Sequence, residues 1–438
     1  MSNELNQILI SSSQPDFKKR MGTLRTAIIK AAIFEAGDPR YTQIKDIIEG
    51  VKNRGDEAVA EFTEKYDKIK LTPNQFQVDK ADLKKAHNEL EKNDPKLLDS
   101  LRQAITNVEN YQKEIFIGNK NLPGIKYTPI KRVGICVPGA SAPLPSTVIM
   151  TAVPAKVAGV KEIAVVSPPR HNGSIHPAIL AACYELKITE VYRIGGAQAV
   201  AALAFGTNNV RKVHKIVGPG NIWVQFAKRE LFGMLIDIDS IAGPSEVLII
   251  ANDKANPSWI AADMLSQAEH APGSAILFTD SQQLAENTLS ELKKQVTQLN
   301  RTEETIECLT KYCGIVVFGN MDDAIEWAND FAAEHLEIQC GDQSRAIADK
   351  IENAGAIFIG DYSPVAVGDY WAGPSHTLPT GMTAKFFSAL SANDFIKSTS
   401  IIEYDKKKLA ESAEDIIRLA EAEGLDAHAK SIRIRQQD

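Results

Sequence analysis

The chain has 438 residues, which at roughly 150 residues per domain suggests two to four compact units. Hydrophobic residues make up 44% of the chain and charged residues 24%, as in globular proteins that bury a core, and the formal net charge is -7. Because this charge is negative and no basic block occurs, we expect neither a nucleic acid nor an anionic membrane as partner.

The pattern is mainly helical up to about residue 130. Apolar residues recur at helical spacing over residues 44–66, with a break at Gly55-Asp56. The same helical spacing continues over residues 83–115. The first 30 residues are predicted to form a separate helical arm.

From Val133 the sequence pattern changes to short β-rich runs that alternate with Ala-rich helical patterns. This alternation predicts βαβ units and a mainly parallel sheet. A second set of the same kind includes a helix whose Asn256-Pro257 start fits an N-cap followed by proline. The predicted strands are 133–137, 163–166, 191–194, 215–217, 235–238, 247–251 and 275–279, and the predicted helices are 146–158, 177–186, 198–205, 221–231, 257–270 and 282–299.

We therefore predict an α/β protein with two Rossmann-like domains, one inserted in the other. Residues 31–132 and 245–390 form the first domain, which we expect to carry most of the metal and substrate site. Residues 133–244 form the second domain, which we expect to bind the cofactor. Residues 391–397 and 408–423 are helical again. Residues 391–438 are accordingly predicted to be a small C-terminal helical segment.

Nothing in the sequence points to a membrane or to an oxidising compartment. No apolar run approaches the ~20 residues of a membrane helix, and the first ten residues lack the basic start of a signal peptide. The cysteines form neither a CxxC pair nor a disulfide framework, so we expect a cytoplasmic protein with five ordinary, small apolar cysteines. These are Cys136, Cys183, Cys308, Cys313 and Cys340.

Glycine and proline cluster directly after several predicted strands. Ligands of open α/β sheets bind beyond the carboxyl ends of the strands, where such turns lie, although tight βα turns also need glycine without any ligand. No GxGxxG fingerprint is present, so a dinucleotide site would be atypical. The turns are Pro138-Gly139, Gly195-Gly196, Gly218-Pro219-Gly220 and Gly243-Pro244.

Several histidines stand beside other polar residues that bind metals or transfer protons. Gln267 and His270 close a predicted helix and share one helix face, where the free carbonyls favour a cation. Glu334-His335 closes another helix and could divide acid and base work, or could simply be a solvated helix end. Asp369 lies on a glycine-rich loop that also holds His376, and the pair could be ligand and substrate contact or merely turn residues.

One glutamine, two histidines and one aspartate form a nitrogen and oxygen donor set that suits zinc. Eight strings, in order, resemble the histidinol dehydrogenase family and cover most of residues 40–438. They are RVGICVPGASAPLPS, GGAQAVAALAFGT, GPGN, AGPSEVLIIA, LSQAEH, AEHLEI, GDYWAGPSHTLPTG and LAEAEGLDAH.

The resemblance implies oxidation of L-histidinol to L-histidine through L-histidinal with two NAD, the last steps of histidine biosynthesis. It also implies one zinc ion per subunit and an intertwined homodimer with shared active sites. By motif position the zinc ligands are Gln267, His270, Asp369 and, from the other subunit, His428. All four also lie against the substrate.

The remaining roles are also carried over by motif position. His335 is the general base and contacts the substrate, and Glu334 activates water. Ser245, His376 and Glu423 are further substrate contacts, and Cys136, Gln198 and Asn221 are cofactor contacts.

The chain departs from the family pattern in one turn. Cys136 stands where a cofactor-contacting tyrosine is common, and Ala140 replaces a frequent glycine. Ser375 stands where asparagine is common, a change that we expect to be tolerated.

Three other functions are compatible with part of this pattern. A related zinc dehydrogenase of another polyol would tend to lack the C-terminal Glu423 and His428. A zinc hydrolase would use Glu334 as its base and would form no NADH. A non-catalytic metal-binding scaffold is disfavoured because every expected ligand and base is retained.

Overall fold

A computed structural model describes residues 4–32, 38–139, 143–270 and 272–437. The chain divides into two compact units. The first comprises the described residues of 1–116 and 129–395, and the second those of 117–128 and 396–438. In the described residues no helix is long and apolar enough to cross a membrane.

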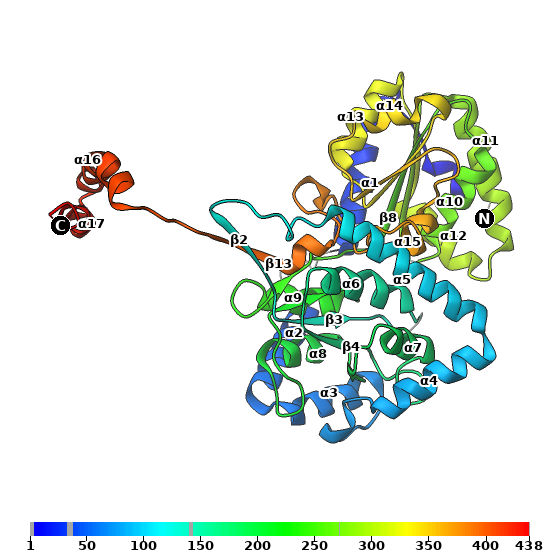
Figure 1. Ribbon diagram of the computed structural model, residues 1–438. Coiled ribbons are helices and arrows are strands. Elements are labelled where there is room, and N and C mark those ends of the chain that lie inside the picture. Colours follow the sequence, from blue (N-terminus) through cyan, green and yellow to red (C-terminus); the bar gives the residue numbers. More distant parts are fainter. Residues whose placement is uncertain (1–3, 33–37, 140–142, 271, 438) are drawn as a thin grey trace. The chain divides into compact units, whose positions relative to one another are not determined.

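A six-stranded parallel sheet forms one part of the first unit, with strand order β1-β10-β9-β8-β11-β12 (Figure 1). Alternate residues of each strand face opposite sides, so β8 contributes Val247 and Ile249 to one hydrophobic core and Leu248 and Ile250 to another. The strands are β1 (Leu9–Ser11), β8 (Glu246–Ala251), β9 (Ser274–Thr279), β10 (Gly314–Val317), β11 (His335–Gln339) and β12 (Ala356–Ile359).

Helices cover both faces of this sheet. Helices α10, α11 and α12 pack over one face, and α1, α13 and α14 over the other. The Asn256 side chain accepts a hydrogen bond from the Ser258 N–H, which confirms the predicted cap of α10. The helices are α1 (Phe17–Ala32), α10 (Pro257–Ala268), α11 (Gln282–Gln295), α12 (Thr302–Tyr312), α13 (Met321–Phe331), α14 (Ser344–Ala348) and α15 (Val365–Tyr370).

A five-stranded parallel sheet forms the other part, with strand order β5-β4-β3-β6-β7. The order reverses between β3 and β6, which makes this gap a topological switch point of the Rossmann type. The strands are β3 (Arg132–Cys136), β4 (Glu162–Val166), β5 (Glu190–Tyr192), β6 (Lys215–Val217) and β7 (Asp237–Ile238).

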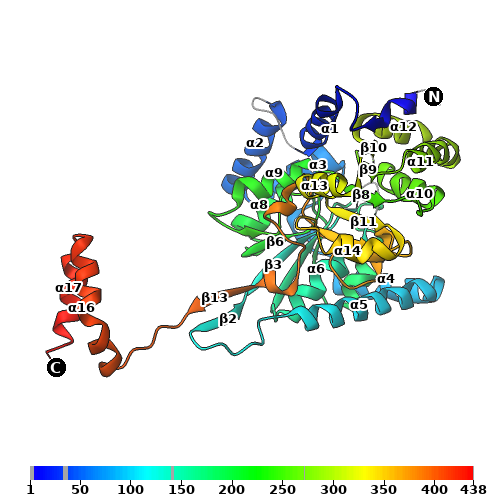
Figure 2. The same ribbon diagram turned by 90° about the horizontal axis from the view of Figure 1, so that it is seen from above.

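Helices α2, α3, α8 and α9 share one core of the five-stranded sheet, while α5 packs on α6 and α4 on α7 (Figure 1 and Figure 2). Gly55, with φ of 55°, separates α2 from α3 at the predicted break. The helices are α2 (Pro39–Arg54), α3 (Asp56–Asp67), α4 (Lys80–Asn93), α5 (Pro95–Ile115), α6 (Pro145–Val157), α7 (Pro177–Glu185), α8 (Gly196–Phe205) and α9 (Ile222–Leu231).

Two domain assignments from the sequence were wrong. The first 30 residues are not a separate helical arm, because β1 pairs in parallel with β10 and α1 packs in the core of the six-stranded sheet. Helices α2 and α3 pack in the core of the five-stranded sheet, not with residues 245–390. The prediction of parallel α/β sheets is confirmed.

The second unit has little core of its own. Its strands β2 (Ile125–Pro129) and β13 (Ile396–Ser400) form a two-stranded sheet, and its helices are α16 (Lys406–Ala422) and α17 (Asp426–Ile434). The predicted helix over residues 391–397 is instead a 3-10 turn, Ala392–Phe395, that leads into β13. The buried cluster of the two helices consists of Ile417, Ala420 and Ala429.

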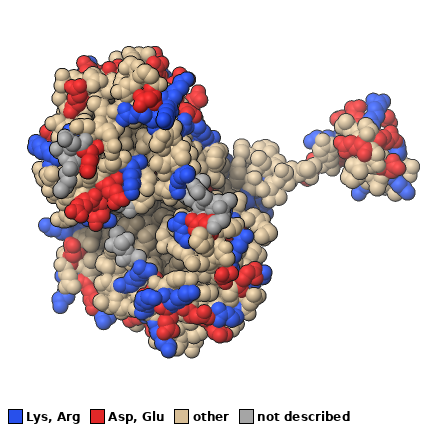
Figure 3. Space-filling model, turned by 180° about the vertical axis from the view of Figure 1, so that it is seen from behind, with Lys and Arg blue, Asp and Glu red and all other residues tan. Residues whose placement is uncertain are grey.

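Charged side chains of both signs are scattered over the face in Figure 3. This distribution agrees with the absence of a basic block in the sequence.

Candidate active site

A cavity of ≈ 230 Å³ lies where strands of the six-stranded sheet begin. We call it the amino-edge cavity, because Ser245 directly precedes β8 and Glu334 directly precedes β11. It brings together all the predicted substrate, metal and proton-transfer residues of the first unit. These are Ser245, Gln267, His270, Glu334, His335, Asp369 and His376.

The Glu334 carboxylate is fixed by two hydrogen bonds. The Ser245 hydroxyl donates to Glu334 Oε2 at 2.5 Å, and the backbone N–H of Glu246 donates to the same oxygen at 2.8 Å. Helix α13 ends at Phe331, and Ala332 with φ of 50° turns the chain toward β11. The sequence placed Glu334 at the end of this helix, whereas it lies between helix and strand.

The His335 ring is oriented by the neighbouring strand. Its Nδ1 donates to the backbone oxygen of Glu246 at 2.9 Å, because β11 lies directly beside β8. The other ring nitrogen, Nε2, is buried without a hydrogen-bond partner and lies 3.6 Å from Asp369 Oδ1. Nε2 is therefore the nitrogen that can exchange a proton with a molecule in the cavity.

Burial and charge act against each other at this pair. Burial raises the pKa of Glu334, and the neighbouring His335 only partly offsets that rise. Burial alone would lower the pKa of His335, but the carboxylates of Glu334 and Asp369 outweigh it and raise that pKa to about 9. The charges of the two groups thus depend on each other.

The predicted metal ligands of the first unit enter the cavity from two helices. Gln267 lies in the last turn of α10, but this helix ends at Ala268, so His270 belongs to the turn that follows and not to the predicted helix face. Asp369 lies within α15 and not on a loop as predicted. In the described residues no group of three or more His, Cys, Asp and Glu side chains could hold a metal ion.

The donor set nevertheless fits a zinc ion that receives a further ligand from elsewhere. Gln267 is 3% exposed, and its Nε2 atom is buried without a hydrogen-bond partner. A buried amide costs free energy unless it binds something, and the side-chain oxygen and nitrogen positions of such an amide are interchangeable. Together with the His270 imidazole and the Asp369 carboxylate, this amide supplies three of the four donors expected at zinc.

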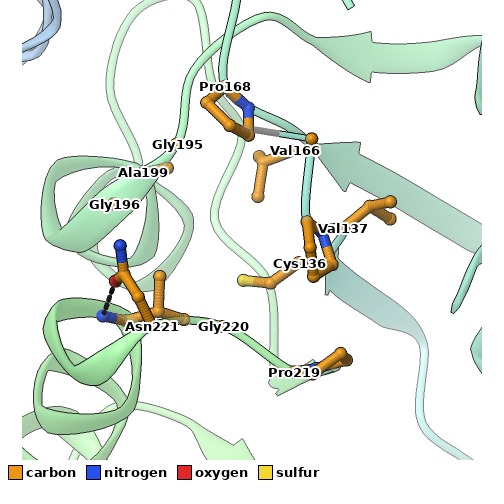
Figure 4. Close-up of a pocket in the computed structure, with 13 residues that line it drawn as sticks. Cys136, Val137, Val166, Pro168, Gly195, Gly196, Ala199, Pro219, Gly220 and Asn221 are labelled. Atoms are coloured by element: carbon orange, nitrogen blue, oxygen red, sulfur yellow. Dashed lines mark hydrogen bonds between the residues drawn. The ribbon is translucent and has the colours of Figure 1, made fainter. Parts of the chain in front are cut away.

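A second pocket, of ≈ 320 Å³, lies at the carboxyl ends of the five-stranded sheet, at the switch point (Figure 4). We call it the carboxyl-edge pocket. Cys136 and Asn221 face the same space, and Asn221 Oδ1 accepts from the Val224 N–H at 3.3 Å to cap α9. The described lining residues include no charged side chain. They are Cys136, Val137, Pro138, Gly139, Val166, Pro168, Gly195, Gly196, Ala199, Pro219, Gly220, Asn221 and Val224.

The carboxyl-edge pocket shares lining residues with two other cavities. Asn221 also lines an adjacent cavity of ≈ 220 Å³ that contains Gln198 and Arg170, so the three predicted cofactor contacts lie along adjoining cavities. Pro219 lines both the carboxyl-edge pocket and the amino-edge cavity.

A family model described as histidinol dehydrogenase matches residues 36–436. A histidinol dehydrogenase of Rhodopirellula baltica is 46% identical over 401 residues, covering 90% of this chain and 86% of the relative, and one of Oceanobacillus iheyensis is 47% identical over 400 residues, covering 90% and 92%. A crystal structure of histidinol dehydrogenase from Elizabethkingia anophelis is 33% identical, with a TM-score of 0.88, and covers 98% of both chains.

The chain belongs to the histidinol dehydrogenase family. It is therefore an enzyme of the dehydrogenase class. The resemblance inferred from the eight strings is confirmed.

Two of the residues carried over from the family lie in the second unit. Glu423 caps the C-terminal end of α16, and His428 lies in the first turn of α17. Both side chains are exposed. The cavity residues of the first unit and these two residues thus belong to separate compact units.

The departures from the family pattern have different outcomes. Cys136 lines the carboxyl-edge pocket, and burial raises the pKa of its thiol to about 12, so it is an unreactive apolar contact. All five cysteines are buried and free, as predicted. The Ser375 hydroxyl donates to the Met150 backbone oxygen at 2.8 Å, and Ala140 lies outside the described residues.

Sequence reasoning missed a buried ion pair that holds the Gly218 turn of this family member. Lys228 Nζ donates to the Gly218 oxygen at 3.1 Å and pairs with Asp239, and the Gly218 N–H donates to Asp239 Oδ2 at 2.6 Å. Asp239 also lines the amino-edge cavity. Its position directly after a predicted strand and before Gly243-Pro244 is the signal that could have identified it.

Proposed function

We propose that this protein oxidises L-histidinol to L-histidine through L-histidinal, with two NAD, as the last steps of histidine biosynthesis in the cytoplasm. The observation that carries the proposal is the buried Glu334-His335 pair, which lines one cavity with Gln267, His270 and Asp369. Membership of the histidinol dehydrogenase family supports the choice of substrate.

Gln267, His270 and Asp369, with His428 of a second subunit, are the proposed ligands of one zinc ion per subunit. Zinc bound there would supply a Lewis acid that orients the imidazole and amine of the substrate and would offset the negative charge of Asp369. Ser245, His376 and Glu423 are the proposed further substrate contacts. His376 is half-buried, and Thr147 Oγ1 lies 3.4 Å from its Nε2, which holds the ring against the cavity.

His335 acts as the base in the first oxidation. Asp369 helps to raise the pKa of His335 to about 9, so a zinc ion that offsets the charge of Asp369 would lower that pKa and favour the neutral ring. In the neutral ring Nδ1–H is held by the Glu246 carbonyl, and Nε2 presents its lone pair to the cavity. Nε2 takes the hydroxyl proton while the carbinol carbon loses a hydride, which leaves the aldehyde.

Glu334 acts in the second oxidation. Its carboxylate takes a proton from water as the water oxygen adds to the aldehyde carbon, which gives the hydrate. His335 releases its first proton to solvent before this stage. Loss of a second hydride from that carbon, with the hydroxyl proton passing to the neutral His335, then leaves the carboxylic acid of histidine. The Ser245 and Glu246 hydrogen bonds keep Glu334 in place through both stages.

The carboxyl-edge pocket is the proposed NAD site. NAD supplies the hydride acceptor, and Cys136, Gln198 and Asn221 are its proposed contacts. The residues fit a dinucleotide, because helices α8 and α9 begin at this edge and their N-terminal N–H groups favour phosphate. A Cβ atom at Gly220 would lie 2.6 Å from Val224, so the backbone of this turn has no room for a side chain.

The test is an NADH assay with L-histidinol. Two NADH should form for each histidinol consumed, with histidine as product, because His335 provides the base for each hydride loss and Glu334 activates the water that the second stage needs. Glu334→Gln should slow aldehyde oxidation more than alcohol oxidation, since only the aldehyde needs an activated water. If no NADH forms from histidinol, the proposal is contradicted. That result would favour a hydrolase, or a dehydrogenase that acts on another polyol.

The proposed homodimer shares its active sites through His428. The second unit buries little surface alone and leaves Ile402 83% and Leu419 68% exposed, which supports a partner subunit that covers this face.

Co-expression of His270→Ala with His428→Ala chains tests the shared site. A mixed dimer then contains one intact site, and random pairing should restore about a quarter of wild-type activity. Verified mixed dimers without any activity would contradict a shared site.

A further inference from the structure

A polar cluster of two buried side chains and one half-buried side chain lies outside the amino-edge cavity and connects elements that line this cavity. Asp263 lies on α10, and Glu337 and Gln339 lie on β11. Glu337 is 1% exposed and Gln339 is 3% exposed. None of the three lines the cavity, so the proposed chemistry does not account for them.

The cluster is joined by hydrogen bonds to three elements. Gln339 Nε2 donates to Asp263 Oδ2 at 2.9 Å and to Glu337 Oε2 at 3.2 Å, and Glu337 Oε1 accepts from the Val365 N–H at 2.9 Å. Burial and the neighbouring Asp263 carboxylate raise the pKa of Glu337 to about 8. Glu337 therefore keeps its proton at neutral pH and donates it in a hydrogen bond to Asp263.

Each anchored element carries a residue of the proposed site at a fixed offset. Asp263 lies one helical turn before Gln267 on α10, and Val365 lies one turn before Asp369 on α15. Glu337 lies two residues after His335 on β11, so the two side chains leave the same face of the strand. The cluster thus sets the distance between the two helices and the strand.

We propose that Asp263 and Glu337 are positioning residues, which hold Gln267 and Asp369 at the separation that a metal ion requires. This inference rests on the zinc site proposed above. Residues that orient ligands without touching the metal typically change metal affinity 10–100-fold when they are removed. A side chain that only stabilises the fold would leave that affinity unchanged.

The experiment measures zinc affinity of the purified full-length dimer by competition with a chromophoric chelator, together with unfolding by denaturant. Asp263→Ala should weaken zinc binding about 10–100-fold, because the α10 anchor is lost. Glu337→Gln should stay within about threefold of wild type, because a glutamine can still accept from Val365 and donate to Asp263 as the protonated acid does.

The matched control is Asp56→Ala in the five-stranded part. Asp56 is 8% exposed and accepts hydrogen bonds from Asn209 N at 3.1 Å and Asn209 Nδ2 at 2.8 Å. Neither Asp56 nor Asn209 lines the amino-edge cavity or the carboxyl-edge pocket. This variant should lose stability but keep its zinc affinity within about twofold. If Asp263→Ala does not fold, Asp263→Asn keeps the volume without the charge and should weaken zinc binding about three- to tenfold.

The outcomes separate the two proposals. A wild-type protein that binds no zinc contradicts the proposed function. A wild-type protein that binds zinc, with equal affinity in the folded Asp263 variant, overturns the positioning role alone. Equal losses of zinc affinity in the Asp263 and Asp56 variants would also overturn it, because the effect would then be general loss of stability.

Discussion

The two sheets of the first unit have the same strand order around their centres but use opposite edges. Across the sheets, β10-β9-β8-β11-β12 and β5-β4-β3-β6-β7 both have the earliest of these five strands in the middle, and the strand order reverses beside it. Strand β1 extends the six-stranded sheet beyond β10. The five-stranded sheet offers a pocket at its carboxyl edge, and the six-stranded sheet offers a cavity at its amino edge.

The difference has an electrostatic reason. Crossover helices of a parallel sheet begin at the carboxyl edge and end at the amino edge, so partial positive charge gathers at the first and partial negative charge at the second. The pocket beside the starts of α8 and α9 is lined without charged side chains in the part of the chain that the structure describes and suits a phosphate group. The cavity beside the end of α10 holds Asp369 and Glu334 and suits a cation.

The largest expected effect comes from the amino edge. His335→Asn can keep the hydrogen bond to the Glu246 carbonyl but has no basic nitrogen, so kcat with histidinol should fall about 10²–10⁴-fold. Binding of NAD at the other edge should change less than about twofold, as measured by titration of the purified variant. A parallel loss of NAD affinity would show that the two edges are not separate in function.

A change at Glu246 should alter how stability depends on pH. Burial and the neighbouring Glu334 raise the pKa of Glu246 from 4.5 to about 8. The folded protein therefore keeps a proton that the unfolded chain releases, so stability is fully present below pH 4.5 and is lost as pH rises toward about 8.

Glu246→Gln removes this term. Across that interval the wild type should lose on the order of 1–4 kcal/mol of unfolding free energy relative to the variant. Denaturant titrations at a series of pH values measure the difference. A difference that is constant with pH would mean that Glu246 ionises normally in the folded protein.

The smallest expected effect is at the carboxyl edge. Gly218 has φ of 104°, and a Cβ atom there would lie 2.3 Å from the Cys136 carbonyl oxygen, so Gly218→Ala must shift the turn. The Kd for NAD should rise about tenfold or more, at a cost of about 1–3 kcal/mol in stability, with zinc content unchanged.

Gly173→Ala is the control for this change, because Gly173 also has a positive φ, 76°, but nothing lies within 4 Å of the added Cβ. It should lose stability through backbone strain and keep its NAD affinity. Equal NAD affinities in the two variants would contradict the importance of the Gly218 turn.

The sequence predicted most strands and helices because alternation of β-rich and Ala-rich runs is a local signal. It could not predict which sheet α2 covers, because an amphipathic helix does not specify its partner. Strand β1 was missed since three residues, Leu9–Ser11, are too few for a periodic pattern.

The candidate site was predictable where residues stand side by side in sequence. Glu334 and His335 are adjacent, and the motifs selected Gln267, His270 and Asp369, the proposed ligands, which line the same cavity. The role of Asp263 was not predictable, because it depends on a hydrogen bond to Gln339, which is remote in sequence. The position of Asp239 after a predicted strand was a signal, but its pairing with Lys228 could not be predicted from it.

Strand β1 has a consequence for how the protein is made. Leu9 pairs with Ile315, and at about 5–20 residues per second the ribosome completes β10 on the order of 15–60 s after Leu9 is synthesised. During that interval the Phe17 side chain of α1 lacks Phe318 and Trp327, the two rings against which it packs in the folded protein. The outermost strand can therefore be added only late in synthesis, and the nascent chain needs protection from aggregation at its N-terminus until then.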